Sequence, residues 1–161
     1  MISISSLILQ KFTDFVITFT EKEHNIEEHR ISLIEDSSFD PLNAFNLIND
    51  DHTSLISRKQ LQSFLLNNKI YGTNEEIDLL IQENNEENRS GISYTKFLNI
   101  IYPSSKTNEN HQSFKKEIKT ICNSKIIEFN LSMILSEIIK QNRILIKFRK
   151  EFSSYKSFHP I

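Results

Sequence analysis

The residues best suited to chemistry in this 161-residue chain form one polar stretch, NDDHTSLISRKQ, at positions 49–60. Oxygen-bearing side chains recur through it at short intervals, and helix-forming sequence flanks it on both sides. Recurring oxygen donors between two helices are typical of a loop that binds a hard cation such as Ca²⁺. The last residue of such a loop supplies a carboxylate, and here that residue is Gln60. The stretch therefore has the form of a cation-binding loop without its strongest ligand.

Other kinds of chemistry find little support in the sequence. The five histidines form no spaced pair with cysteine or acidic residues of the kind that binds metals, and His24 and His29 point to different faces of their helix. Two glycines are too few for a glycine-rich phosphate loop. The single cysteine, Cys122, has the apolar setting of a small buried hydrophobe. We expect no catalytic residue and no enzyme activity.

The bulk composition indicates one domain with a real core. The hydrophobic fraction is 38% and the formal net charge is −2, which gives no reason to expect nucleic acid as a partner. The single cysteine suits a reducing compartment. The apolar N-terminus is too short to span a bilayer and has no basic leader region. Basic residues gather towards the C-terminus, where a solvated helix face is the first interpretation and an anion-binding patch the alternative. We expect an intracellular protein without a membrane span.

Two long amphipathic helices are predicted at the ends of the chain. Residues 1–37 hold one of them, and residues 124–161 hold the other, with residues 104–123 as a polar linker and short helix. The apolar seam of the second helix runs to about Phe152 and is interrupted once, at Gln141. The seams can pair with each other, meet a partner's helix, or do both at once, and the sequence leaves these options open.

Between these helices, residues 38–103 read as helix–loop–helix twice. Asp40 is a predicted N-cap before Pro41 at the first helical position. Capping boxes at Ser57 with Gln60 and at Thr73 with Glu76 begin two further helices. The two units repeat at 36 residues, so that the pair Ile56 and Ser57 matches Ile92 and Ser93.

On these residues the segment resembles the paired EF-hands of the calmodulin superfamily. Ile56 and Ile92 occupy the position at which the two loops of such a pair join through a short strand. The wider order, in which a long helix ends at Phe39-Asp40-Pro41 and the pair ends at Tyr102-Pro103, resembles calmodulin-like EF-hand proteins of ciliates. The resemblance implies an all-α fold, with a paired EF-hand flanked by long N- and C-terminal amphipathic helices.

The resemblance also implies which positions would hold calcium. In the first loop they are Asn49, Asp51, Thr53, Leu55 through its carbonyl, Ser57 and Gln60; in the second they are Asn85, Glu87, Arg89, Gly91 through its carbonyl, Ser93 and Lys96. Ser54 replaces the turn glycine, and Gln60 removes the bidentate carboxylate. A lysine ammonium ~4 Å from a divalent cation is repelled by roughly 8 kcal/mol, about the total binding energy of a micromolar site. We therefore expect neither calcium nor another cofactor, with the loop positions vestigial.

A pair that cannot bind calcium, by this resemblance, is a structural or adaptor subunit that clamps a partner helix in a stable assembly. The expected location is the cytoplasm or cytoskeleton, and the ciliary axoneme is one such cytoskeletal assembly. The residues expected to face the partner are Phe45, Ile48, Leu61, Phe64, Leu65, Leu80, Ile81, Phe97, Ile101, Ile127, Ile134, Ile138, Leu145 and Phe148. Two alternatives stay open: a calcium-responsive regulator with a weak first site, and a peripheral accessory subunit of a large membrane complex.

Overall fold

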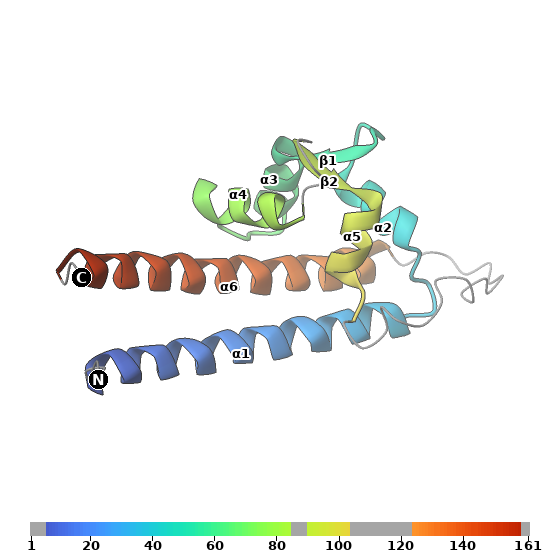
Figure 1. Cartoon of the computed structure of the whole chain (residues 1–161). Coiled ribbons are helices and arrows are strands. Elements are labelled where there is room, and N and C mark those ends of the chain that lie inside the picture. The colour runs from blue at the N-terminus through green and yellow to red at the C-terminus, as the bar shows by residue number, and fades with distance from the viewer. Residues whose placement is uncertain (1–5, 85–89, 104–123, 159–161) are drawn as a thin grey trace.

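The computed structural model describes residues 6–84, 90–103 and 124–158, and these are mostly helical (Figure 1). The elements are α1 (Ser6–Glu35), α2 (Pro41–Ile48), β1 (Leu55–Ser57), α3 (Arg58–Asn67), α4 (Asn74–Glu83), β2 (Gly91–Ser93), α5 (Tyr94–Ile101) and α6 (Ser124–Phe158). The predicted linker at 104–123 lies outside the described residues.

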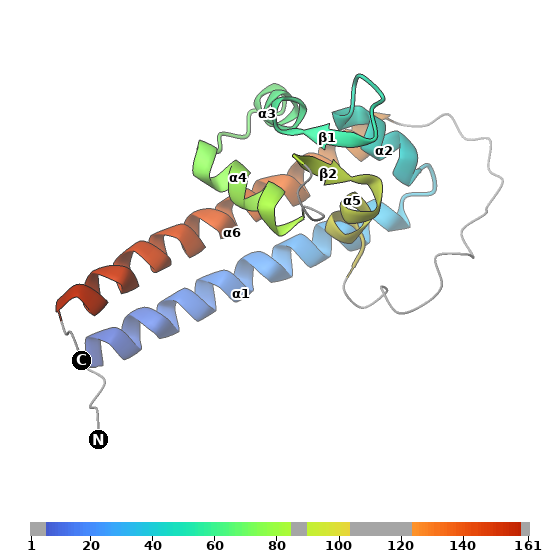
Figure 2. The ribbon, with the colours of Figure 1, turned by 45° about the horizontal axis from the view of Figure 1, so that its top comes forward.

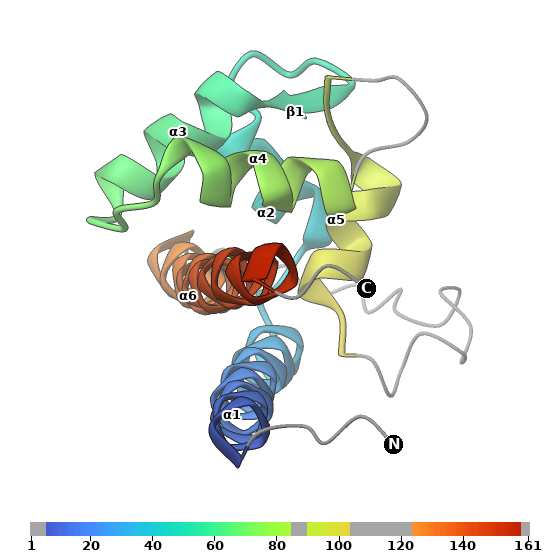
Figure 3. The same cartoon turned by 60° about the vertical axis from the view of Figure 1, so that its left-hand side comes forward.

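The two long helices, α1 and α6, lie antiparallel and side by side (Figures 1 and 3). Near one end Lys11 Nζ is 3.2 Å from Glu151 Oε2, and towards the middle Asn25 Nδ2 donates to Glu137 Oε2 at 3.3 Å. Of the two options left open by the sequence, the long helices thus pair within one chain. Helix α6 continues to Phe158, six residues beyond the end predicted from its seam, because the next helix-breaking residue is Pro160.

Residues 41–101, which we call the head, contain two helix–strand–helix units. The predicted caps are confirmed: Asp40 accepts from the Leu42 N–H ahead of α2, and both capping boxes are present. The first box is Ser57 with Gln60, and the second joins Thr73 to Glu76, at the starts of α3 and α4. The second helix of the first unit, α3, and the first helix of the second unit, α4, therefore begin where the sequence predicts.

The two units meet through the short strands β1 and β2, which pair antiparallel. Ile56 lies opposite Ile92, as the 36-residue repeat predicts, and both side chains are buried. Gly91 lies opposite Ser57, so close to the neighbouring strand that a Cβ atom on it would stand 2.6 Å from the Ile56 carbonyl oxygen. The pairing therefore depends on a residue without a side chain at position 91.

Helix α6 is the central element, because the head covers one of its faces and α1 covers another (Figures 2 and 3). The residues of α6 buried in the common core are Ile127, Leu131, Ile134, Leu135, Ile138 and Ile139. From α1 only the second half enters this core, through Ile26 and Leu33. The head and the long helices thus share one hydrophobic core, and α6 joins them.

Candidate functional site

The 49–60 loop closes on the side-chain amide of Gln60. Its nitrogen Nε2 lies 2.7 Å from Asp51 Oδ1 and 3.1 Å from both Asn49 Oδ1 and Asp50 Oδ1. Its oxygen Oε1 accepts from the backbone N–H of Ser57 at 2.7 Å, as the capping box requires. The amide therefore donates to side-chain oxygens at two of the positions that the resemblance assigns to calcium, Asn49 and Asp51, and to Asp50 between them.

Two further contacts tie the loop to itself. Asn49 Nδ2 donates to the Thr53 carbonyl at 2.6 Å, and Thr53 Oγ1 donates to the Leu55 carbonyl at 2.9 Å. The left-handed turn of the loop falls on His52, with φ 54°, and not on Ser54, where the resemblance places its turn glycine. The loop thus turns at a different residue, and its own side chains satisfy several of its oxygens.

Hydrogen bonds within the loop stabilise the negative charge of Asp51. The hydrogen bond from Thr53 is the main cause that holds the pKa of this carboxyl below its usual value, with Gln60 adding to it. These are neutral donors, so the charge of Asp51 is stabilised without a cation. The loop's own neutral donors thus favour the ionised form of the Asp51 carboxyl.

The second loop is described only from Ser90 onward, so Asn85, Glu87 and Arg89 lie outside the described residues. Ser93 caps α5 by accepting from the backbone N–H of Lys96 at 3.4 Å. Gly91 is buried in the strand pair. These three described positions thus have structural roles in a cap and a strand, and the Lys96 side chain is half-buried.

The head packs against α6, through the residues that were expected to face a partner helix. All nine head residues expected to face a partner are buried in the core that includes α6: Phe45, Ile48, Leu61, Phe64, Leu65, Leu80, Ile81, Phe97 and Ile101. From α6, Ile127, Ile134 and Ile138 are buried in the same core. The chain therefore covers these residues with its own elements.

The remaining two expected partner residues lie further along α6, where it contacts the first half of α1. Leu145 is half-buried, and the Phe148 ring stacks on Phe15 with centroids 3.9 Å apart. Phe12 and Phe152 extend this cluster, at centroid distances of 6.1 and 4.3 Å from Phe148. Aromatic packing thus fastens α1 to α6 beyond the edge of the head.

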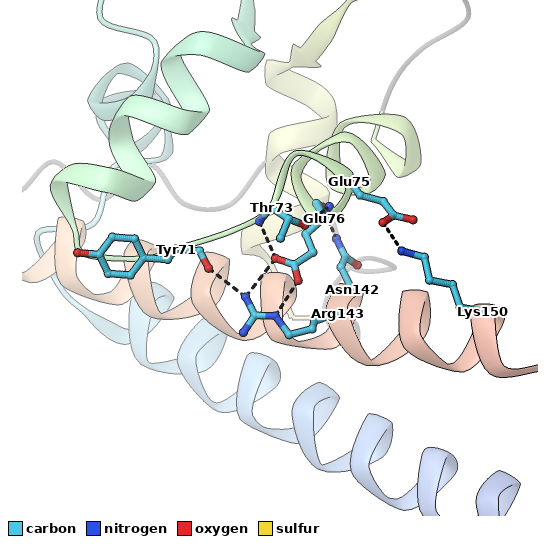
Figure 4. Close-up of polar contacts among 7 residues, drawn as sticks. All are labelled: Tyr71, Thr73, Glu75, Glu76, Asn142, Arg143 and Lys150. Carbon is cyan, nitrogen blue, oxygen red and sulfur yellow. Dashed lines mark hydrogen bonds and ion pairs between the residues drawn. The ribbon is translucent and has the colours of Figure 1, made fainter.

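Polar contacts fasten α6 to the start of α4 (Figure 4). Arg143 Nε donates to Glu76 Oε1 at 2.7 Å and its Nη2 donates to Oε2 at 3.1 Å, a bidentate pair. The same Nη2 is 3.0 Å from the Tyr71 carbonyl, and Asn142 Nδ2 donates to the Glu76 carbonyl at 3.0 Å. Lys150 adds an exposed ion pair with Glu75. Both oxygens of the buried Glu76 carboxylate are therefore satisfied.

The Glu76 carboxyl is buried, and burial alone would raise its pKa. The hydrogen bonds from Arg143 and from the backbone of Thr73 outweigh this effect and hold the pKa below its usual value. The Glu76 carboxylate thus both caps the start of α4 and binds Arg143 of α6.

A second buried carboxylate, Glu137, fastens α6 to α1. Burial would raise its pKa, but hydrogen bonds from Lys140, Asn25 and Lys22 lower it below the usual value. One turn later, Gln141 Nε2 donates to Glu23 Oε2 at 2.9 Å. The polar interruption of the predicted seam is therefore a specific contact between the long helices.

Sequence reasoning missed a second buried face of α6. A single heptad seam accounts for the residues near α1, but Leu135, Ile139 and Asn142 lie on a second buried face. A Cβ atom on Gly72 would stand 3.3 Å from Ile139 Cγ2, which places that face against the start of α4. The signal was present as apolar residues in adjacent pairs, such as Ile134-Leu135 and Ile138-Ile139, which are typical of a helix covered on two sides.

The histidine, cysteine and acidic side chains of the described residues are dispersed. Within residues 6–84, 90–103 and 124–158, no three histidine, cysteine or acidic side chains converge as a metal site would require. His24 pairs with Glu28 on the surface at 3.3 Å, while His111 and His159 lie outside the described residues. Nor does any helix in the described part of the chain combine the length and apolarity needed to cross a membrane.

The chain was compared with known proteins at three levels. Neither a family model, nor a curated protein, nor a solved structure matches it.

Proposed function

We propose that this protein is a non-catalytic structural or adaptor subunit built on an EF-hand pair that works without calcium. The observation that best supports this is the Gln60 amide, whose nitrogen lies within 3.1 Å of three loop oxygens. In a calcium-binding EF-hand the residue at this place brings a carboxylate to the ion. Here a neutral hydrogen-bond donor holds the loop oxygens together in place of the ion, so the loop stays closed without calcium.

The geometry of α6 supports a clamp that is already occupied. In calcium sensors, ion binding opens the helix pair and exposes an apolar groove for a partner helix. In this chain α6 takes the place of that partner, held by the shared core and by the Glu76–Arg143 pair. We infer that the pair is a fixed support for the α1–α6 hairpin, and that the hairpin presents the protein to a larger scaffold, in the cytoskeleton or an axoneme.

The proposal is tested by calcium binding and by partner retention together. Calorimetric titration of the full chain with CaCl₂ is expected to give no binding heat up to millimolar concentration. Affinity capture from the native source in EGTA and high salt is expected to retain the same protein partner as capture in calcium. Loss of the partner on chelation, restored by calcium, would support a calcium-responsive regulator and overturn the proposal.

A further inference from the structure

The first half of α1 lies beyond the common core, at the end of the hairpin where the packing is thinnest. None of residues 6–25 of α1 and none of residues 143–153 of α6 is buried, whereas Ile26 and Leu33 of α1 are 1% and 0% exposed. Helix α6 lies between this half of α1 and the head (Figures 1 and 3). We call residues 6–20 the arm. The two halves of one helix thus differ sharply in burial.

The aromatic contacts of the arm converge on one residue of α6. The Phe15 ring stacks on Phe148 with centroids 3.9 Å apart, and the Phe12 ring lies 6.1 Å from the same side chain. The nearby pair of Lys11 with Glu151 is more than a third exposed on both sides, and such surface ion pairs contribute little to stability. We therefore expect the attachment of the arm to depend mainly on Phe148.

The sequence of the arm, SLILQKFTDFVITFT, favours a helix only weakly. It has no alanine, and its β-branched side chains, which lose rotamer freedom in a helix, are Ile8, Thr13, Val16, Ile17, Thr18 and Thr20. All three threonine hydroxyls donate to the carbonyl four residues earlier, an arrangement that slightly destabilises a helix. An isolated helix of about 12–15 residues is marginal in water even when it is rich in alanine. The arm therefore depends on α6 for its helical state.

Polar contacts separate the arm from the firmly held half of α1. The buried Glu137 carboxylate of α6 accepts from Lys22 and Asn25 of α1. Further along α1, Arg30 Nε donates to the Ile100 carbonyl at 2.8 Å, which ties this half of the helix to the end of α5. Separation at Glu137 would leave a buried charge without its partners, which is strongly unfavourable. Detachment that begins at the arm is therefore expected to stop at Lys22.

We propose that the arm detaches from α6 and unwinds as one unit, while the head and the second half of α1 stay docked. A segment with few buried contacts opens at a lower free energy than the core to which it is attached. Opening uncovers the Phe148 ring, so the arm controls access to this part of α6. The inference rests on the distribution of burial along the hairpin and not on the proposed calcium-independent clamp.

The first test is amide hydrogen exchange of the full chain at neutral pH in EGTA. Relative to the rates of an unfolded chain, we expect residues 10–20 to exchange at least about 100-fold faster than residues 131–142. The arm should still exchange at least about tenfold more slowly than an unfolded chain, because it is docked most of the time. Low urea concentrations should accelerate residues 131–142 far more than the arm, since local opening exposes less surface than global unfolding.

Equal protection of the two segments would overturn the proposal, because the arm would then open only when the whole chain unfolds. An arm without any protection would also overturn it, because there would be no docked state to leave. Neither result depends on calcium binding, so a failure here is distinct from a failure of the proposed clamp.

The variant Phe148→Ala tests the contact that holds the arm. It should accelerate exchange of the arm by about tenfold and leave residues 131–142 nearly unchanged. The matched control Phe129→Ala makes the same change on α6 at a position that is 60% exposed, and the arm should exchange as in wild type. Equal acceleration of the arm by both variants, or of both segments by Phe148→Ala, would contradict a separately opening arm.

A second variant tests the same claim by strengthening the arm, so its outcome does not depend on a destabilised chain. Thr13→Ala with Thr20→Ala changes two exposed positions and replaces weak helix formers with the best one. We expect exchange of the arm to slow by roughly three- to tenfold, with residues 131–142 unchanged. Unchanged or faster exchange of the arm would show that its opening does not involve unwinding, and would overturn the proposal.

Discussion

The side-chain nitrogen of Gln60 lies 2.7 Å from Oδ1 of Asp51, at the centre of a loop that has the form of a cation site. An amide is a neutral donor, so it binds the loop oxygens without adding a positive charge to the loop. The same amide oxygen caps α3 through the Ser57 N–H. Loop closure and helix initiation therefore depend on one side chain.

Replacing Gln60 by glutamate should both damage the loop and restore a response to calcium. The carboxylate would lose the amide's hydrogen bonds and lie beside Asp50 and Asp51. We expect a loss of about 1–2 kcal/mol in the free energy of unfolding in EGTA. Millimolar CaCl₂ should recover part of that loss, measured by urea unfolding, because Ca²⁺ favours a bidentate glutamate at this place.

The control for this variant is Gln62→Glu, which makes the same chemical change two residues further along α3, where the side chain reaches Asn74. It should be nearly neutral and indifferent to calcium. If Gln60→Glu proved as stable as wild type in EGTA, the amide would not be what closes the loop.

The Glu76–Arg143 pair should contribute measurably to the docking of α6. Arg143→Ala would leave the buried Glu76 carboxylate with only its cap contacts, which we expect to cost about 1–3 kcal/mol, since the arginine itself is half exposed. Arg149→Ala, on the same helix at an exposed position, is the control and should change the free energy of unfolding by less than about 0.5 kcal/mol. Equal effects from the two variants in thermal or urea unfolding would refute the role of the pair.

The pH dependence of stability follows from Glu76 and Glu137. Both have a folded-state pKa below the ordinary value of 4.5, so between these values the unfolded chain binds more protons than the folded one. Their stabilisation is complete above the unfolded pKa and is lost as the pH falls through the folded values. The urea concentration at the unfolding midpoint should therefore decrease as the pH is lowered below about 4.5. The double variant Glu76→Gln with Glu137→Gln should show a smaller decrease over the same pH range.

The strand pair should be far less tolerant of a methyl group at Gly91 than the head is at Gly72. At Gly91 the new Cβ would meet the Ile56 carbonyl at 2.6 Å, and backbone cannot move aside cheaply. At Gly72 it would meet the Ile139 side chain at 3.3 Å, which has some freedom. We expect Gly91→Ala to cost about 1–3 kcal/mol and Gly72→Ala less, as measured by urea unfolding. The reverse order would contradict the strand register.

Local signals made much of the fold predictable. The caps at Asp40, Ser57 and Thr73 and the partnership of Ile56 with Ile92 follow from residue types at fixed spacings, and they are observed. The location of α6 could not be predicted in the same way. Its packing against the head depends on contacts such as Asn142 with the Glu76 carbonyl, which are 66 residues apart and leave no periodic trace.

The loop illustrates the same limit at the level of chemistry. The sequence indicates that Gln60 deprives a cation of its carboxylate, but it does not indicate that the amide turns towards Asp51 and donates to it. That outcome depends on side-chain orientation, which the Ser57 cap fixes by holding the amide oxygen. Residue types predict what is missing from a site more readily than what fills it.

The most direct test of the account is the distance between α3 and α6 with and without calcium. Spin labels on cysteines at Ser63 and Lys147, both exposed, in a Cys122→Ser background would report it by pulsed electron paramagnetic resonance. We expect one narrow distance distribution, identical in EGTA and in millimolar CaCl₂, because α6 is held permanently. A distribution that broadens or lengthens when calcium is added or removed would show that the head still opens, and would contradict the calcium-independent clamp.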